Sequence, residues 1–231
     1  MNWLLQNLGQ VGELVLVHLG LSVPAIILSF VIAIPIGYLA HRQRWARGVL
    51  LTLCGILYAI PSLALFIALP AITGFGIRSP LNLVVALTLY GIAVMVRTAA
   101  DAFDAVSPDT RLAATAVGYS ATGRFWAVEL PLAGPVLLAG LRVVIVSTVS
   151  LVTVGAVIGV PSLGSLFTDG FQRGIVAEIV TGIVATMVLA LILDALSVLG
   201  GRLLLPWSRR SAPSRRGAAP SPTPVEAREA A

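Results

Sequence analysis

Two residues of opposite charge lie inside long apolar stretches of this sequence, where a charge is costly. Arg142 falls within the apolar run 132–158, and Asp194 falls within the run 177–204. A charged side chain at the centre of a membrane helix costs about 2.5–3.5 kcal/mol on insertion scales, so it usually faces a partner or a water-filled path. We expect an Arg142–Asp194 ion pair that joins two helices near the cytoplasmic side. The alternative is that each side chain reaches the membrane surface separately.

A second candidate for a functional element is the dipeptide Pro61-Ser62, halfway along the apolar run 49–70. A proline inside a membrane helix frees a carbonyl group and lets the helix bend, which is useful in alternating access. Pro61 and Ser62 are therefore candidate gate residues, although an ordinary kinked helix has the same pattern. Three aromatic residues could offer ring faces to a cation or serve only in packing: Tyr58, Phe66 and Tyr90.

The segment 101–131 is too long and too patterned for a simple connection. Residues 107–109 (Ser-Pro-Asp) are typical of a helix start, because serine caps free amides, proline fits the first turn and aspartate favours the positive end of the helix dipole. The alanine-rich stretch that follows ends at Gly118, which suits a left-handed cap. We expect a short helix, a glycine break and a second short helix from Ser120, before Pro131 opens the next long helix.

Composition excludes several kinds of chemistry. All 15 basic residues are arginine, whereas a Walker A loop or a Schiff-base enzyme needs a lysine. Cys54 is a lone cysteine, and His18 and His41 have no cysteine or acidic neighbours at metal-ligand spacing. We therefore expect no catalytic residue, no cofactor and no metal site, and we interpret the protein as a transport subunit rather than an enzyme.

The elements that position these residues are apolar helices. The chain is 58% hydrophobic and 11% charged, whereas soluble domains carry roughly 25% charged residues. About 20 apolar residues of helix cross a bilayer, and five stretches approach or exceed that length: 14–40, 49–70, 81–100, 132–158 and 177–204. The sequence predicts an all-α integral membrane protein of about five transmembrane helices. One domain covers residues 1–207, and residues 208–231 have the composition of a disordered cytoplasmic tail.

The arginines predict an orientation, because they are concentrated in alternate loops. They occur in the 41–48 and 101–131 segments and after residue 200, whereas the other loops hold only Arg78 and Arg173. The positive-inside rule then places the arginine-rich segments and the C-terminus in the cytoplasm and the N-terminus outside. Membrane topology thus explains the net charge of +5, and we expect no nucleic-acid partner.

The 101–131 segment resembles the EAA loop of ABC-importer permeases. The family pattern is E-A-A, three residues, G, nine residues, I-x-L-P, and this chain keeps its spacing with Leu112 in place of Glu and Val128 in place of Ile. The resemblance implies a coupling helix that docks on a separate ATPase subunit, so that a charge at Ala114 would lie against the docking surface. An alanine-rich interfacial helix without a partner is the alternative. The matching residues are Ala113, Ala114, Gly118, Val128, Leu130 and Pro131.

Further segments are similar to the quaternary-amine permeases, which import glycine betaine, choline or carnitine. They are residues 58–65 (YAIPSLAL), 131–142 (PLAGPVLLAGLR) and 158–164 (IGVPSLG). The resemblance implies a permease subunit with the type I importer fold in the cell membrane, where two copies, or one copy and a paralogue, enclose the path of a small-molecule solute. It also implies an ATP-binding subunit and an extracytoplasmic substrate-binding protein as partners.

Other functions stay open on the sequence alone. Methionine-type permeases have similar loops, so a different small solute is one alternative. An ATP-independent secondary transporter would need its own coupling-ion site, for which Asp194 and Glu178 are the only acids near the later spans. A membrane-embedded enzyme is a third alternative, but no cluster of histidine, cysteine and acidic residues supports it.

Overall fold

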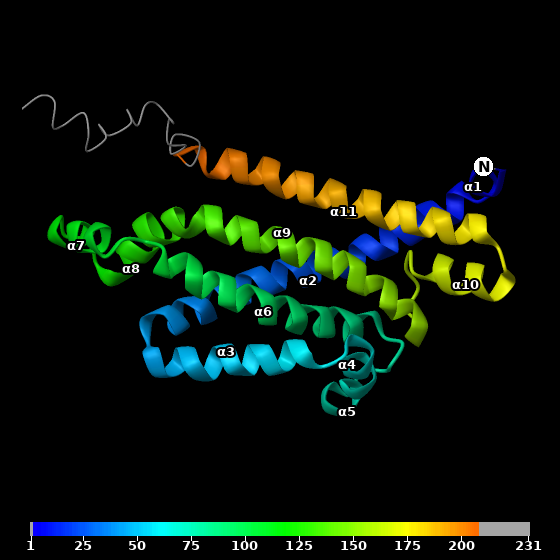
Figure 1. The fold of residues 1–231 in the computed structure, drawn as a ribbon, viewed down its shortest axis with the longest axis horizontal. Helices are drawn as coiled ribbons and strands as arrows, with labels where there is room; N and C mark the ends of the chain where they lie inside the picture. The colour runs from blue at the N-terminus through cyan, green and yellow to red at the C-terminus, as the bar shows by residue number, and fades with distance from the viewer. Residues whose placement is uncertain (1, 208–231) are drawn as a thin grey trace, which may run out of the picture.

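Long apolar helices dominate the structure. The computed structural model describes residues 2–207, and the long helices in it are α2 (Leu8–Arg42), α6 (Pro80–Asp104), α9 (Leu130–Val154) and α11 (Val176–Leu204). They run side by side along the long axis of the molecule (Figure 1). Each is long and apolar enough to cross a membrane, α9 together with the short helical turns at its two ends. No β-strand occurs between residues 2 and 207. The prediction of an all-α membrane bundle is therefore confirmed.

The second apolar run is bent sharply rather than kinked. Helix α3 (Arg44–Ala59) ends before Pro61, and α4 (Ser62–Ala68) with α5 (Pro70–Thr73) leaves it at an angle of 95°. The 16 residues of α3 extend only about 24 Å, less than the ~30 Å hydrocarbon core. The described chain thus has four spans, or five if the bent pair counts as one. The proline break expected in this run is present, but it is a full helix end rather than a kink, because Pro61 follows a residue held in extended backbone.

Shorter elements connect the spans. They are α1 (Asn2–Gln6), α7 (Pro108–Ala116), α8 (Ala121–Arg124), the π-helix η1 (Phe125–Glu129), the 3₁₀ turn η2 (Gly155–Ile158) and α10 (Ser165–Arg173). One end of the bundle holds α7, α8, the α2–α3 turn and the last turn of α11, whereas the N-terminus and α10 lie toward the other end (Figure 1). The arginine-rich segments of residues 2–207 therefore gather at one end. The tail predicted over 208–231 lies outside the described residues.

Helix α6 is central and packs closely on α2. In its apolar segment 61% of the residues are buried, whereas the value for α11 is 17%. Small residues permit the contact: a Cβ added at Gly37 would lie 2.4 Å from the Cβ of Ala99, and one at Gly91 would lie 2.1 Å from the Oγ of Ser29. Membrane helices associate through such close packing, because lipid tails are as apolar as the helices themselves.

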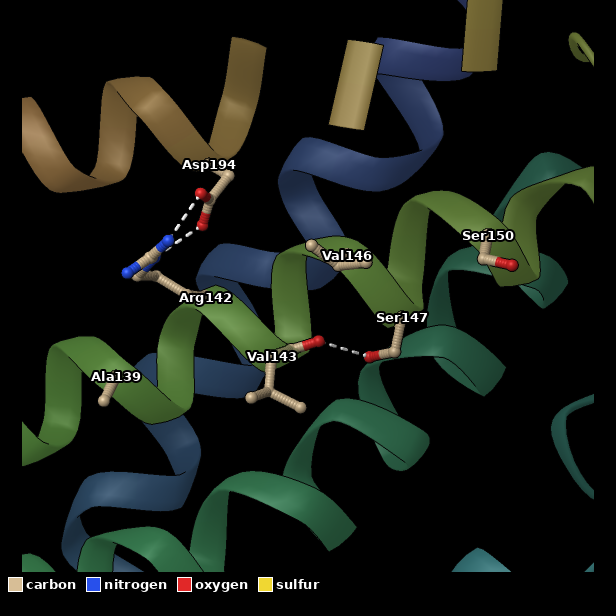
Figure 2. Close-up of a pocket in the computed structure, with 7 residues that line it drawn as sticks. All are labelled: Ala139, Arg142, Val143, Val146, Ser147, Ser150 and Asp194. Atoms are coloured by element: carbon tan, nitrogen blue, oxygen red, sulfur yellow. Dashed lines mark hydrogen bonds and ion pairs between the residues drawn. The ribbon is translucent and has the colours of Figure 1, made fainter. Parts of the chain in front are cut away.

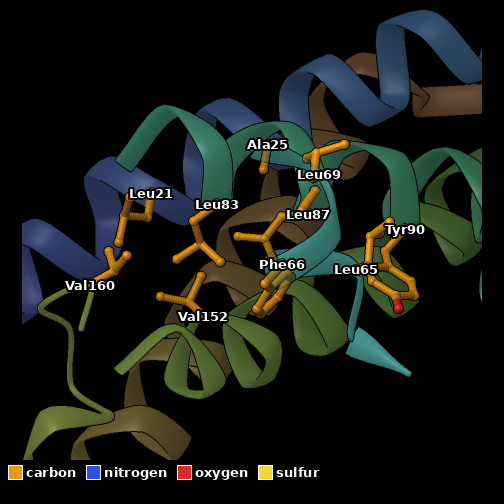
Figure 3. Close-up of a cluster of buried hydrophobic side chains, with 11 residues drawn as sticks. Leu21, Ala25, Leu65, Phe66, Leu69, Leu83, Leu87, Tyr90, Val152 and Val160 are labelled. Atoms are coloured by element: carbon orange, nitrogen blue, oxygen red, sulfur yellow. The ribbon is translucent and has the colours of Figure 1, made fainter. Parts of the chain in front are cut away.

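A buried cluster holds the bent segment α4 against this core (Figure 3). Phe66 is fully buried within it, among Leu83, Leu87 and Val152. The side chain of Asn82 donates a hydrogen bond to the carbonyl oxygen of Phe66 at 3.0 Å. Phe66 is therefore a packing residue and offers no ring face to a solute.

Candidate functional site

The loop before α9 folds as a helix, a glycine break and a second helix. The Oγ of Ser107 accepts a hydrogen bond from the amide of Asp109 at 3.2 Å, which caps α7. At its other end Gly118 has a φ of +96°. The amides of Gly118 and Tyr119 donate to the carbonyls of Thr115 and Ala114 at 3.0 and 3.1 Å, the pair of bonds that closes a Schellman cap. The predicted local structure is confirmed.

One face of α7 is apolar and uncovered. Leu112 is 69% exposed and Val117 is 80% exposed, and Ala113 between them is also exposed. Ala114 is only 8% exposed, because it points back into the protein. The expectation that a charge at Ala114 would lie on the docking surface is therefore wrong: the face that a partner could reach is formed by Leu112, Ala113 and Val117.

A buried carboxylate fastens α7 and α8 to the start of α9. The side chain of Glu129 is 2% exposed, and its Oε1 accepts a hydrogen bond from Arg124 Nε at 2.7 Å. Its Oε2 lies 3.7 Å from Arg111 Nε. Arg124 also donates from Nη1 to the hydroxyl of Thr115 at 2.9 Å, and Arg111 donates to the carbonyl oxygen of Phe103. We call Arg111, Thr115, Arg124 and Glu129 the Glu129 cluster, which joins three elements through one charge.

Sequence reasoning missed this cluster. Glu129 occupies the variable position of the I-x-L-P pattern, and nothing in that pattern marks it as buried. It ends the π-helix η1, and π-helical turns are rare and frequent at functional sites. The available signal was a single acidic residue close to two arginines of the same loop, at five and eighteen residues before it.

The Glu129 cluster leads to a stability prediction. Glu129→Gln keeps the side-chain size but leaves Arg111 and Arg124 without their carboxylate. We expect the free energy of unfolding to fall by about 2 kcal/mol, which is less than the roughly 3–5 kcal/mol of a fully buried pair because both arginines are partly exposed. Thermal unfolding in detergent measures this loss. The matched control is Glu13→Gln, an exposed acid at the far end of the bundle, and equal melting temperatures for the two variants would contradict the role of Glu129.

The remaining residues of the loop pattern lie where α9 begins. Val128, Leu130 and Pro131 are partly buried, and Pro131 stands in the first turn of α9. The indole nitrogen of Trp207 donates to the carbonyl oxygen of Pro131 at 3.3 Å. The end of α11 is thereby attached to the start of α9, next to the Glu129 cluster.

Arg142 and Asp194 are joined across the gap between α9 and α11 (Figure 2). The Nε of Arg142 donates to Oδ1 of Asp194 at 2.6 Å, and Nη2 donates to Oδ2 at 2.8 Å. This bidentate geometry is the strongest form of arginine–carboxylate pair. Arg142 stands at the middle of α9, deeper than the cytoplasmic side where we expected it. Its side chain is 48% exposed on the outer surface of the chain, beside a hollow of about 580 Å³.

One of the two candidate gate residues lines a second hollow, of about 400 Å³. Ser62 lies on its wall, and Pro61 precedes it at the bend between α3 and α4. The hydroxyl of Tyr90 donates to the carbonyl oxygen of Ile60, so it satisfies a group that the bend sets free. The ring of Tyr58 meets that of Tyr90 edge to face, with centroids 6.3 Å apart. The structure thus places Ser62 beside both tyrosines but not beside Arg142.

The two hollows are neighbours on one face of the chain. Both are lined by Ser147 and Ser150 of α9. Polar side chains on the outer surface of membrane helices usually face a water-filled path or another subunit rather than lipid. This face is the candidate translocation surface.

Comparison with known proteins finds transport proteins that are similar over most of the chain. Residues 25–210 match the family described as binding-protein-dependent transport system inner membrane component. The chain is 33% identical to the osmoprotectant import permease protein OsmW of Salmonella typhimurium, over 84% of this chain and 91% of that protein. It is 26% identical to the choline transport system permease protein OpuBB of Bacillus subtilis, over 82% and 86% of the two chains.

The fold also matches a solved structure. A chain from the inward-facing MetNI methionine ABC transporter superimposes with a TM-score of 0.69, over 87% of this chain and 97% of that one. The sequence identity of this pair is 21%, so the likeness concerns the fold alone.

Proposed function

The chain belongs to the family of binding-protein-dependent transport inner membrane components, the permease subunits of ABC importers, and on that premise we propose that it carries a quaternary-amine osmoprotectant. The solute class is glycine betaine, choline or carnitine. The observation that carries this proposal is the identity of 33% to an osmoprotectant permease over 84% of the chain. The 58–65 and 131–142 segments, which resemble those of quaternary-amine permeases, support it.

The α7–α8 segment is proposed to dock on a separate ATP-binding subunit. Leu112 and Val117 form an exposed apolar face on a helix that stands outside the four spans, and exposed apolar surface of this kind marks a protein contact. The Glu129 cluster then transmits a displacement of α7 to the start of α9. Pro61 and Ser62 are proposed to act as a gate where α3 bends into α4. An extracytoplasmic binding protein delivers the solute at the opposite end of the bundle, and a second permease copy or paralogue completes the path.

Uptake by the reconstituted complex tests the function. The permease is incorporated in vesicles with its ATP-binding subunit and its binding protein, and labelled glycine betaine, choline, carnitine and methionine are offered in turn. We expect ATP-dependent uptake of at least one quaternary amine and none of methionine. Uptake of methionine alone would favour the methionine-type permease. Uptake that continues without the ATP-binding subunit would favour a secondary transporter.

The orientation yields a separate prediction. With α7 in the cytoplasm, a cysteine at Val117 should react with a membrane-impermeant thiol reagent only from the inside, and a cysteine at Ile72 only from the outside. Both positions are more than three-quarters exposed, at 80% and 84%. The experiment uses a background in which Cys54 is replaced by alanine. Labelling of the Val117 cysteine in intact cells would overturn the orientation.

A further inference from the structure

A third hollow, of about 380 Å³, lies between α3 and α6. Its wall includes Cys54, Tyr58, Val94, Arg97 and Thr98. It continues into the hollow of Ser62 and Tyr90, because Tyr58 and Val94 line both. Most of the lining is small or apolar, so the aromatic ring and the guanidinium are the groups with distinctive chemistry.

Tyr58 presents an open ring to this hollow. The residue is 57% exposed, and the T-shaped contact with Tyr90 holds the ring from one side. A quaternary ammonium ion has no hydrogen to donate, so it is attracted to an aromatic face within about 6 Å rather than to hydrogen-bond acceptors. Tyr58 therefore provides one half of a site for such a cation.

Arg97 provides a positive charge, which attracts an anionic group rather than a cation. It is exposed, and no carboxylate of residues 2–207 lies within ion-pair distance of it. Helix α6 continues beyond Arg97 to Asp104, where Asp101 and Asp104 are paired with Arg47 at 3.0 and 2.6 Å. Arg97 is thus set back from the charged end of α6, and a guanidinium at that depth calls for an anionic partner.

The spacing of the two groups fits one small solute. The Arg47 contacts align α3 and α6 at their charged ends, and counting along both antiparallel helices puts Arg97 level with Cys54. Tyr58 is one helical turn beyond Cys54, a rise of about 6 Å. A molecule that carries an ammonium group at one end and a carboxylate at the other can contact Tyr58 and Arg97 together.

We propose that this hollow is a transit site for zwitterionic quaternary amines, with Tyr58 receiving the ammonium group and Arg97 the carboxylate. The proposal rests on the proposed function and narrows it. Glycine betaine and carnitine carry both groups, whereas choline carries only the ammonium. Tyr58 should therefore matter for all three solutes, and Arg97 for the two zwitterions.

The uptake rates of two solutes, measured in one preparation, test this site. The complete complex is reconstituted with Arg97→Gln, Arg97→Lys, Tyr58→Ala or Tyr58→Phe, and initial rates are measured for glycine betaine and choline in the same vesicles, with each binding protein–solute pair saturating. The ratio of the two rates cancels differences in the amount of folded permease. Arg44→Gln and Ile56→Ala are the controls, since Arg44 and Ile56 are exposed on α3 and do not line the hollow.

We expect Arg97→Gln to lower glycine betaine uptake about tenfold or more, with choline uptake changed by less than about twofold. Arg97→Lys should retain much of the betaine rate, Tyr58→Ala should slow both solutes, and Tyr58→Phe should slow neither. An equal fall of both rates in Arg97→Gln, or no fall, would overturn the site and leave Arg97 a structural or headgroup-facing residue.

The wild-type rates separate the two proposals. A wild-type complex that carries no quaternary amine refutes the proposed function and this site with it. A complex that carries choline but no zwitterion refutes the site alone. If only the zwitterions are carried, the comparison is between Arg97→Lys and Arg97→Gln: rescue by lysine supports the site, and equal loss in both refutes it.

Discussion

Replacing Gly118 with valine is expected to abolish solute uptake while the permease still inserts in the membrane. Gly118 has a φ of +96°, and no atom lies within 4 Å of where its Cβ would stand, so the cost of the side chain is entirely that of the backbone. A residue with a Cβ resists this conformation by ~1–2 kcal/mol. We expect relief of that strain to break the Schellman cap, rotate α7 against α8 and displace Leu112 and Val117, the residues proposed to dock on the ATP-binding subunit.

Three measurements separate uncoupling from unfolding: membrane abundance, retention of the ATP-binding subunit in a pull-down, and uptake. Gly48→Val is the matched control, because Gly48 is an exposed glycine inside α3 with open space around its Cβ and no positive φ. Val117→Asp probes the docking face directly, and it replaces the less informative change at Ala114, which is buried. Normal pull-down and normal uptake in both Gly118→Val and Val117→Asp would remove α7 from the mechanism.

Neutralising either partner of the Arg142–Asp194 pair is also expected to cause a large loss of solute uptake. Arg142→Leu or Asp194→Leu leaves one full charge within a membrane helix without its bidentate partner. We expect each single variant to lower uptake by about tenfold or more, through loss of folded protein or of transport. The double variant carries no net charge there and should recover part of the loss.

The same reconstituted vesicles serve for this cycle, with uptake divided by permease content. Arg44→Leu is the control, because it removes an arginine from the end of α3 outside the apolar runs. If the double variant loses as much uptake as the two single variants together, the contact between Arg142 and Asp194 does not contribute to transport. Harmless single variants would mean that the pair is dispensable in the assembled transporter.

Several features of this protein follow from hydropathy, backbone hydrogen bonding and helix capping, which can be read from the sequence. The apolar runs are long enough to cross a bilayer, and they are helical in the structure because a backbone in lipid must satisfy its own hydrogen bonds. Ser107 and Gly118 act within one turn of themselves, so the ends of α7 were predictable from their side chains alone. The Arg142–Asp194 contact was predictable as well, although it joins two helices, because Arg142 is the one charge of the run 132–158 and Asp194 is the acid farthest from the ends of the run 177–204.

Only the tertiary structure decided which way the helices face. Local chemistry puts Ala113 and Ala114 on the same helix, but in the folded chain Ala114 is buried and Ala113 is exposed. Pro61 predicted a disturbance, yet the angle of 95° depends on how α4 packs on α6 through Phe66 and Asn82.

The sequence by itself also does not specify which side chains from distant parts of the chain lie together. Glu129 receives Arg111 and Arg124 only because α7 packs against α8 and η1. Tyr58 shares a hollow with Arg97 only because α3 and α6 are antiparallel neighbours. Capping, proline geometry and hydropathy act over a few residues along the chain. Contacts between separate helices depend instead on packing free energy summed over whole interfaces, which no short stretch of sequence contains.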